Sequence, residues 1–222
     1  MLESWNDDIW IATREIRFLG VETGSRMTVV RLPEGGLFVH SPVALDAETR
    51  AEVDALGDVR AVVAPSLFHH LHVGAWMEAY PKAIFAGCQG LDWKRPDLPF
   101  TCILGDTPHP SWAGQIEQVY FSSRRENEVV FFDARSQTMI CADALLNLSV
   151  HPSATTKLVA KFMGNDAPGT GYLEKVMVRD RQVARRQLDR ILAWNPERII
   201  LSHGGLVHEN GAEVIRHAYA WV

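Results

Sequence analysis

Short apolar runs with turn residues between them dominate the first part of the chain and predict strands. These runs lie at residues 27–32, 36–40, 59–64 and 82–86. The first two flank Pro33-Glu-Gly-Gly, which is typical of a hairpin turn. Helical spacing of apolar positions predicts one helix at 46–56, capped by Asp46 and ended by Gly57, and another at 73–80.

The second part of the chain repeats this order of strands and helices. Strand-like runs lie at 117–121, 128–133, 138–142 and 198–202, and helical spacing recurs at 173–194 and 211–222. Residues 146–171 are irregular and rich in Ser, Thr, Gly and Pro, which fits either a binding loop or a flexible excursion. Because no linker divides the chain, we expect one α/β domain over residues 1–222, with two mixed sheets and the helices outside.

Composition narrows the choice of partner and compartment. The 222 residues are 47% hydrophobic, which is enough for a large core, and the net charge of −5 gives no reason to expect nucleic acid or an anionic membrane as a partner. No stretch approaches the ~20 apolar residues of a membrane span, and the acidic N-terminus lacks the features of a secretory signal. Three widely spaced cysteines, Cys88, Cys102 and Cys141, indicate a reducing, cytoplasmic location without a disulfide framework.

Side chains that bind metals follow several of the predicted strands. His69, His70 and His72 come shortly after the run 59–64, and His203 follows the run 198–202. Asp143 directly follows the run 138–142. Groups at strand ends point into the space above a sheet, where metals and substrates bind in α/β folds. Imidazoles that converge with a carboxylate are typical of a metal site, so these five residues are the candidate ligands and Asp143 is the candidate catalytic residue.

The layout resembles the metallo-β-lactamase superfamily, and within it a bacterial family of unassigned function. The resemblance extends from about residue 10 to the end of the chain. It rests on the words Pro65-Ser-Leu-Phe-His-His-Leu, Asn127-Glu-Val-Val-Phe-Phe, Ala142-Asp-Ala-Leu-Leu-Asn147 and Ser202-His-Gly-Gly. It implies a four-layer αββα sandwich with one or two metals, usually zinc or iron, in a groove at one sheet edge. Glu128 and Asn147 are expected to line that pocket.

The superfamily's metal-binding box, His-x-His-x-Asp-His, is broken in this chain. Aligning its end on His70 puts His69 at the Asp position and Pro65 and Leu67 at the first two histidines. Aligning it on His72 keeps His69 and His72 but puts Leu71 at the Asp. In either alignment the acidic ligand of the second metal is missing.

Two further positions depart from the superfamily pattern. No histidine precedes the strand 128–133, where Glu126 or Glu128 is the available oxygen ligand, although a structural role for Glu128 is the alternative. The superfamily's early structural Asp is replaced by His40-Ser-Pro. With these ligands missing, we expect at most one tightly bound metal.

Three functions fit these residues. The first is a metal-dependent hydrolase of a small ester, thioester or phosphoester, with one divalent metal that is zinc in the first place, or iron or manganese. The second is a degenerate, metal-free member of the superfamily that binds a small ligand or serves as a scaffold. The third is metal-free acid–base chemistry by the histidines and Asp143. A fold by itself does not fix a function, so the three remain open; the expected partner is a small-molecule substrate or ligand, and only the scaffold alternative needs none.

Overall fold

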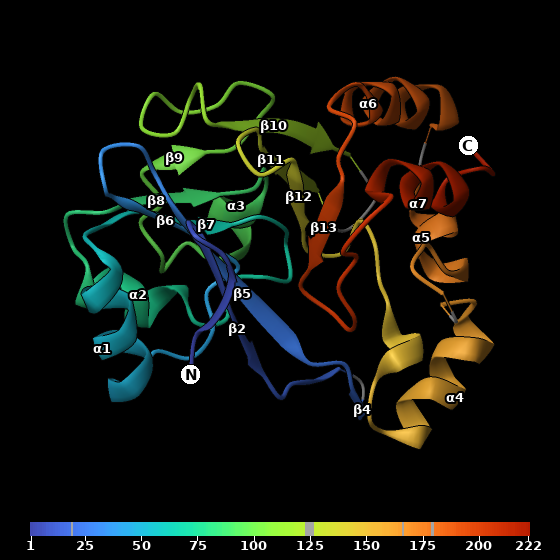
Figure 1. The fold of residues 1–222 in the computed structure, drawn as a ribbon, viewed down its shortest axis with the longest axis horizontal. Coiled ribbons are helices and arrows are strands. Elements are labelled where there is room, and N and C mark those ends of the chain that lie inside the picture. Colours follow the sequence, from blue (N-terminus) through green and yellow to red (C-terminus); the bar gives the residue numbers. More distant parts are fainter. Residues whose placement is uncertain (19, 123–126, 166, 179) are drawn as a thin grey trace.

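The computed structural model describes residues 1–18, 20–122, 127–165, 167–178 and 180–222, without the side chains of Leu173, Glu174 and Met177. Two larger sheets form its centre (Figure 1). The first has the order β1 (Glu3–Asn6), β2 (Ile9–Arg14), β5 (Ser25–Arg31), β6 (Leu37–His40), β7 (Val59–Ala64), β8 (Ile84–Gly87), β9 (Cys102–Ile103). The second has the order β10 (Ile116–Phe121), β11 (Glu128–Asp133), β12 (Thr138–Cys141), β13 (Arg198–Leu201). A small hairpin pairs β3 (Arg17–Phe18) with β4 (Val21–Glu22).

Strand direction determines which loops share an edge. In the first sheet β5 and β6 are antiparallel, whereas β6, β7 and β8 run parallel. In the second sheet β10, β11 and β12 are antiparallel, and β12 and β13 run parallel. The carboxyl ends of parallel neighbours lie at the same sheet edge. The residues after β6 and β7 therefore lie together, and so do those after β12 and β13.

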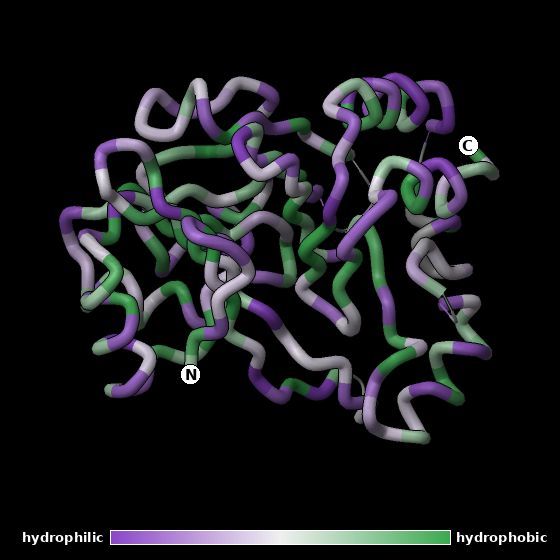
Figure 2. The backbone as a smooth tube through the Cα atoms, viewed as in Figure 1, coloured by the Kyte–Doolittle hydropathy of each residue, from purple (hydrophilic) through white to green (hydrophobic). Residues whose placement is uncertain are grey.

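The two sheets pack face to face through one apolar core. Phe38 and Val63 of the first sheet and Phe131 and Ile200 of the second belong to this core, and each is at most 1% exposed. Phe38 meets Phe131 edge to face, with the ring centroids 5.3 Å apart, a geometry that aromatic pairs prefer. Figure 2 shows that hydrophobic segments run along these central strands.

Helices cover the outer face of each sheet. On the first sheet lie α1 (Ala47–Leu56), α2 (Val73–Ala79) and α3 (Leu91–Lys94), which contribute Val53, Trp76 and Leu91 to a second core. On the second sheet lie α6 (Arg181–Ala193) and α7 (Gly211–Ala218), which contribute Leu188 and Ile215 to a third. The layers are therefore α, β, β and α, as predicted.

The predicted strands agree with the observed ones within two residues, and the first helix has the predicted ends. The carboxylate of Asp46 accepts a hydrogen bond from the backbone N–H of Thr49 at 2.7 Å, and Gly57 follows the last turn of α1. Strands β1 and β2 were not predicted, because only Ile9, Ile11 and Ala12 of their residues are buried hydrophobic residues. β1 is an edge strand without a fully buried side chain, and the apolar residues of β2 are consecutive instead of alternating, so neither strand gives a period-two signal.

The segment 146–171 contains more regular structure than its composition indicates. It includes a short 3₁₀ helix at Leu148–Val150 and the helix α4 (Ala154–Met163). Ser153 caps α4 by accepting from the N–H of Thr156 at 3.3 Å, and Gly164 ends it in the left-handed conformation. The Thr156 hydroxyl donates to the carbonyl of Glu22 at 2.8 Å. This segment is therefore attached to β4.

The single helix predicted at 173–194 is wrong, because the structure has two. The helix α5 (Tyr172–Met177) ends before Asp180, and α6 begins after it. Asp180 is extended, and its carboxylate accepts from the N–H groups of Gln182 and Val183 at 2.8 and 3.1 Å. Asp is a strong N-cap, so this local bond starts a new helix although the apolar spacing continues. Among the described residues no helix is long and apolar enough to cross a membrane.

Replacing Asp180 by Ala is expected to lower the free energy of unfolding by about 1 kcal/mol, because two N–H groups at the start of α6 lose their acceptor. Urea unfolding followed by circular dichroism measures this loss. The control is Asp189→Ala, which removes an exposed ion pair with Arg185 inside the same helix and is expected to cost at most about 0.5 kcal/mol. Equal losses for the two variants would contradict the capping role.

Candidate metal centre

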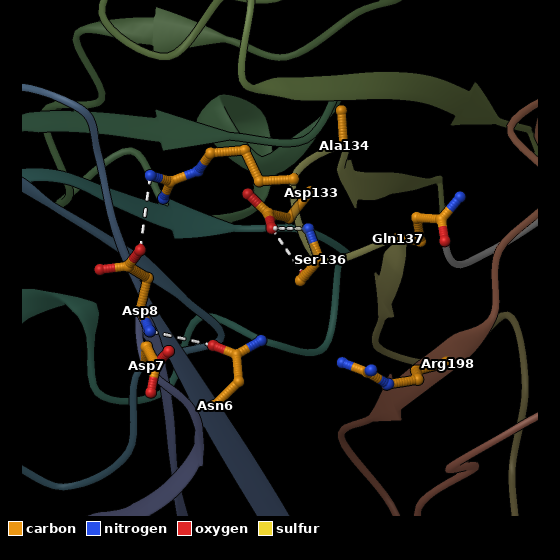
Figure 3. A pocket seen from close by; sticks show the side chains of 9 residues that line it. Asn6, Asp7, Asp8, Asp133, Ala134, Ser136, Gln137 and Arg198 are labelled. Atoms are coloured by element: carbon orange, nitrogen blue, oxygen red, sulfur yellow. Dashed lines mark hydrogen bonds and ion pairs between the residues drawn. The ribbon is translucent and has the colours of Figure 1, made fainter.

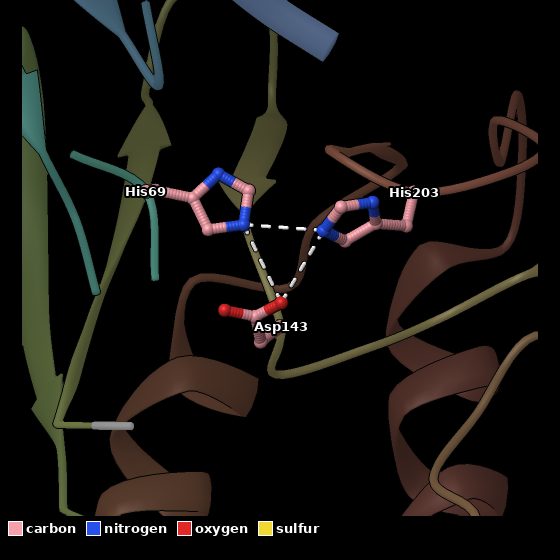
Figure 4. A group of neighbouring side chains, drawn as sticks. All are labelled: His69, Asp143 and His203. Carbon is pink, nitrogen blue, oxygen red and sulfur yellow. Dashed lines mark hydrogen bonds and ion pairs between the residues drawn. The ribbon is translucent and has the colours of Figure 1, made fainter. Parts of the chain in front are cut away.

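Three of the five candidate ligands converge on one point. His69 follows β7, Asp143 follows β12 and His203 follows β13, so two sheets and three strand ends deliver them (Figure 4). The Nε2 atoms of His69 and His203 are 3.2 Å apart, and each lies 3.4 Å from Oδ1 of Asp143. Their side chains are 6%, 14% and 15% exposed in chain order. The group is thus nearly enclosed but reachable from solvent.

The outward-facing atoms of all three side chains already have partners. Nδ1 of His203 lies 2.6 Å from the carbonyl oxygen of Gly24, and Nδ1 of His69 lies 2.6 Å from Oγ of Ser41. Oδ2 of Asp143 accepts from the Ser66 hydroxyl at 2.8 Å. These contacts fix the orientation of each side chain. One potential metal-binding atom of each side chain remains directed inward: Nε2 of His69, Oδ1 of Asp143 and Nε2 of His203.

The three inward-facing atoms form an unusual electrostatic arrangement. A carbonyl oxygen only accepts, so Nδ1 of His203 carries the proton and its Nε2 presents a lone pair in the neutral ring. When Nδ1 of His69 likewise donates to Ser41, two imidazole lone pairs and a carboxylate oxygen face one another. Three such atoms at 3.2–3.4 Å repel unless a cation or a shared proton lies between them.

Asp143 is kept in its anionic form by its neighbours. Burial by itself raises the pKa of this carboxyl group, but the positive charge and hydrogen bonds that His69 and His203 offer when protonated outweigh burial and hold the pKa well below its usual range. The residue therefore offers a charged oxygen to the site at neutral pH.

Ser41 takes a strained conformation to reach His69. It directly follows β6 and has a φ of 54°, in the left-handed region that non-glycine residues rarely adopt. Its N–H donates to the carbonyl of Val63 at 2.9 Å, which holds the backbone in place. Strain of this kind costs roughly 1–3 kcal/mol and is concentrated at functional sites. Here it directs the hydroxyl onto the candidate ligand.

The neighbouring His40 takes no part in the ligand group. Its side chain is fully buried between the sheets, with its ring 5.6 Å from that of Phe131. Neither ring nitrogen has a hydrogen-bond partner in the described part of the chain. Burial, reinforced by His69, lowers the pKa of His40 to about 3. The residue is therefore neutral, so the position where the superfamily carries an Asp contributes no charge here.

Glu128 supports the site from behind. Its carboxylate accepts from the backbone N–H groups of Ala142, Asp143 and Ala144 at 2.5, 2.8 and 2.6 Å. Both oxygens are occupied by backbone donors, and the side chain does not belong to the converging group. Burial and the nearby Asp143 raise the pKa of Glu128 to about 8. The structure thus gives Glu128 the structural role that the sequence left as an alternative.

The structure places His70 and His72 outside the converging group. Nδ1 of His70 lies 2.9 Å from a guanidinium nitrogen of Arg95, which directs the ring toward the end of α3. Burial and the charges of Lys94 and Arg95 lower the pKa of His70 to about 4. His72 is the residue before α2. Of the three histidines that are close in sequence, only His69 therefore belongs to the converging group.

Asn147 contributes its backbone to the site. Its N–H donates to the carbonyl of His203 at 3.3 Å, and its own carbonyl accepts from Gly205 at 2.8 Å. Gly204 lies between them with a φ of +81°, and a Cβ at this position would come within 1.9 Å of the Asn147 carbonyl oxygen. Only glycine fits such a close approach. The turn after His203 is thus fixed against the chain that follows Asp143.

A polar pocket of about 480 Å³ lies at the opposite end of β13 from His203 (Figure 3). Several of its charged groups already have partners. Arg135 lies 3.4 Å from a carboxylate oxygen of Asp8, and Asp133 accepts from the N–H and the hydroxyl of Ser136. No group of converging metal donors is found there among the described residues. The chemistry-bearing residues are therefore at the other edge.

Solved structures with the same fold are metallo-β-lactamases. The DIM-1 metallo-β-lactamase superposes with a TM-score of 0.69 at 16% identity over 99% of this chain and 95% of that chain. FIM-1 from Pseudomonas aeruginosa, in its mono-zinc form, gives 0.66 at 12% identity over 100% and 95%. A metallo-β-lactamase from Erythrobacter litoralis gives 0.67 at 12% identity over 100% and 96%. The chain therefore has the metallo-β-lactamase fold.

The sequence comparison identifies the family. Residues 6–170 match the family described as Domain of unknown function (DUF4336). This match covers more than half of the chain, so the protein belongs to that family. No curated protein sequence matches the chain. The predicted resemblance to a family of unassigned function within this fold is confirmed.

Replacing Glu128 by Gln is expected to destabilise the protein by about 1–3 kcal/mol, because an amide NH₂ would then face a backbone N–H donor. Urea unfolding measures the loss. The control is Glu209→Gln, an exposed residue, which is expected to change stability by less than about 0.5 kcal/mol. A Glu128→Gln variant as stable as the wild type would show that the three backbone bonds do not hold the Asp143 loop.

Proposed function

We propose that His69, Asp143 and His203 bind one divalent metal ion and that the protein is a metal-dependent hydrolase of small esters, thioesters or phosphoesters. One observation carries this proposal. The outward-facing nitrogen or oxygen of each of the three side chains already has a partner, and with Nδ1 of His69 donating to Ser41 the three inward atoms are acceptors within 3.2–3.4 Å of one another. A cation at that point would remove the mutual repulsion and bind the lone pairs of all three atoms.

The donor set fits a metal of intermediate softness. Two imidazoles and one carboxylate suit zinc first, and also iron or manganese. Three protein ligands leave a position open, as in catalytic zinc sites. A bound divalent ion lowers the pKa of a coordinated water to ~7 and so supplies a nucleophile at neutral pH.

The ligand set supports a single metal. Among the described residues this is the one group of three or more potential ligands. One of the two alignments ends the metal-binding box on His70. In that alignment His69 occupies the position of the second metal's acidic ligand, and Pro65 and Leu67 occupy two histidine positions of the box. The chain thus retains donors for one metal position and lacks them for the other.

The roles of the protein groups follow from their contacts. Asp143 supplies negative charge at Oδ1 and is oriented through Oδ2 by Ser66. With a metal bound, this carboxylate would hold the ion and orient the attacking water. His69 and His203 would be the two imidazole ligands, oriented by Ser41 and by the Gly24 carbonyl. The small-molecule substrate and the cytoplasmic location remain part of the proposal; all three cysteines are free.

The rival function is a metal-free protein that binds a small ligand or performs acid–base chemistry. In that case a proton shared among His69, Asp143 and His203 replaces the cation. The two functions differ in their response to metal. An ion that binds only the folded state raises stability by mass action, so only the metal-dependent protein is expected to be stabilised. Metal addition therefore decides between them.

Zinc at 100 times its dissociation constant is expected to stabilise the wild type by about 2.7 kcal/mol, and chelator should reverse the effect. Thermal unfolding with zinc, iron, manganese or chelator measures this. His203→Ala should abolish the response, whereas His217→Ala, on the exposed side of α7, should preserve it. Titration calorimetry should give one site per chain. A flat thermal response of the wild type rejects the metal proposal, and two fully occupied sites reject its stoichiometry.

The Asp143→Asn variant is expected to lose hydrolysis of activated ester, thioester and phosphodiester substrates by about 100-fold or more, because the nearly isosteric amide removes the anionic group. Its unfolding free energy without metal should change little. Steady-state kinetics and urea unfolding measure the two quantities, with His217→Ala as the control. If wild type and Asp143→Asn show the same turnover, Asp143 is not a catalytic residue.

Removing the Ser41 hydroxyl should weaken zinc binding by about 10-fold, because groups that orient ligand histidines are worth 10–100-fold in metal affinity. Titration with a zinc-selective competitor measures the affinity of Ser41→Ala. The matched control is Ser136→Ala, which removes a hydroxyl bonded to Asp133 at the far end of the second sheet. Unchanged affinity in Ser41→Ala would exclude the orienting role.

A further inference from the structure

Arg26 makes an unusual connection between the first sheet and the candidate site. It lies on β5, and only 8% of the residue is exposed. One guanidinium nitrogen donates to the carbonyl of Leu201, and the other donates to the carbonyl of Gly204 at 2.8 Å. Nε donates to the hydroxyl of Thr13 at 3.2 Å. The two carbonyls lie on either side of His203 in the sequence.

This buried charge has a cost that its contacts must offset. Burial lowers the pKa of Arg26, and Glu3 acts weakly in the opposite sense. The guanidinium nevertheless stays protonated, and the structure gives it no ion pair with a carboxylate among the described residues. Three neutral acceptors instead take three of its five N–H donors. A planar fork with donors at fixed spacing suits two carbonyls that belong to one turn.

We propose that Arg26 is a positioning residue for His203. Arg26 fixes the backbone on both sides of His203, while the Gly24 carbonyl, two residues earlier in the chain, holds its ring. His69 is held in the same way by Ser41, which follows β6. Because β5 and β6 are hydrogen-bonded neighbours, the first sheet sets the distance between the two imidazoles.

The inference has a part that stands without any metal and a part that rests on the proposed function. Without metal, Arg26 should protect the hydrogen bond from Nδ1–H of His203 to Gly24. With metal, the loss of Arg26 should lower affinity because the ligand is no longer held in place. The two parts need separate measurements.

The test variant is Arg26→Lys, which keeps the positive charge but cannot bond two carbonyls in one plane. The control is Val53→Ala, which removes buried volume beneath α1 in the core on the outer face of the first sheet. It should destabilise the fold without touching the His203 turn. Proton NMR of the metal-free protein follows the exchange of the His203 Nδ1 proton, and competitive titration gives zinc affinity.

In Arg26→Lys we expect the His203 Nδ1 proton to exchange at least ~10-fold faster than in the wild type, and zinc to bind about 10-fold more weakly. Val53→Ala should match the wild type in both measurements at temperatures where all three proteins are folded. Wild-type exchange in Arg26→Lys overturns the inference. Faster exchange in a protein whose wild type binds no zinc leaves the positioning role intact and overturns only the metal proposal.

A second variant covers the case in which Arg26→Lys does not fold. Thr13→Val removes the acceptor for Nε and leaves the guanidinium in place, and Thr13 is exposed on β2. It should accelerate the exchange of the His203 proton in the same direction by a smaller factor. An exchange rate equal to that of the wild type would then count against the role of Arg26.

Discussion

Face-to-face packing of two sheets is the constraint on which the site depends. Phe38, Phe131 and their neighbours are buried between the sheets, and this burial fixes the relation of β7 to β12 and β13. Apolar packing is close to crystalline density, so the separation of the two sheets is set within narrow limits. The loops after these strands inherit that relation. As a result His69 and His203, from different sheets, bring their Nε2 atoms to 3.2 Å.

Polar groups complete what the packing begins. Three residues around the site are individually unfavourable for folding: Ser41 has a strained backbone, Glu128 is a buried carboxyl group, and Arg26 is a buried cation. Each of them holds backbone or a side chain of the candidate ligands instead of facing the site directly. A catalytic or binding group has to be held to within a fraction of an ångström to be useful. The buried polar residues around the three ligands are consistent with that requirement.

Much of the fold could be predicted because its signals are local. Runs such as 59–64 and 128–133 are apolar and bounded by polar or turn residues, and the Asp46 cap and Gly57 stop appear in order along the chain. The failures were local conflicts between two signals. At Asp180 the apolar spacing continues through a strong N-cap, and the cap prevails. A different reason holds for β1 and β2: β1 has no fully buried side chain, and the apolar residues of β2 do not alternate with polar ones.

For the site, the sequence by itself determined which residue types stand at the ends of which strands. His69, Asp143 and His203 could be named from that pattern, together with the broken metal-binding box. Only the tertiary structure decided that His70 faces Arg95, that Glu128 holds three backbone N–H groups, and that Ser41, Gly24 and Arg26 orient the ligands. The physical reason is that side-chain direction and hydrogen-bond partners depend on contacts between residues up to 179 positions apart, which leave no periodic trace in the sequence.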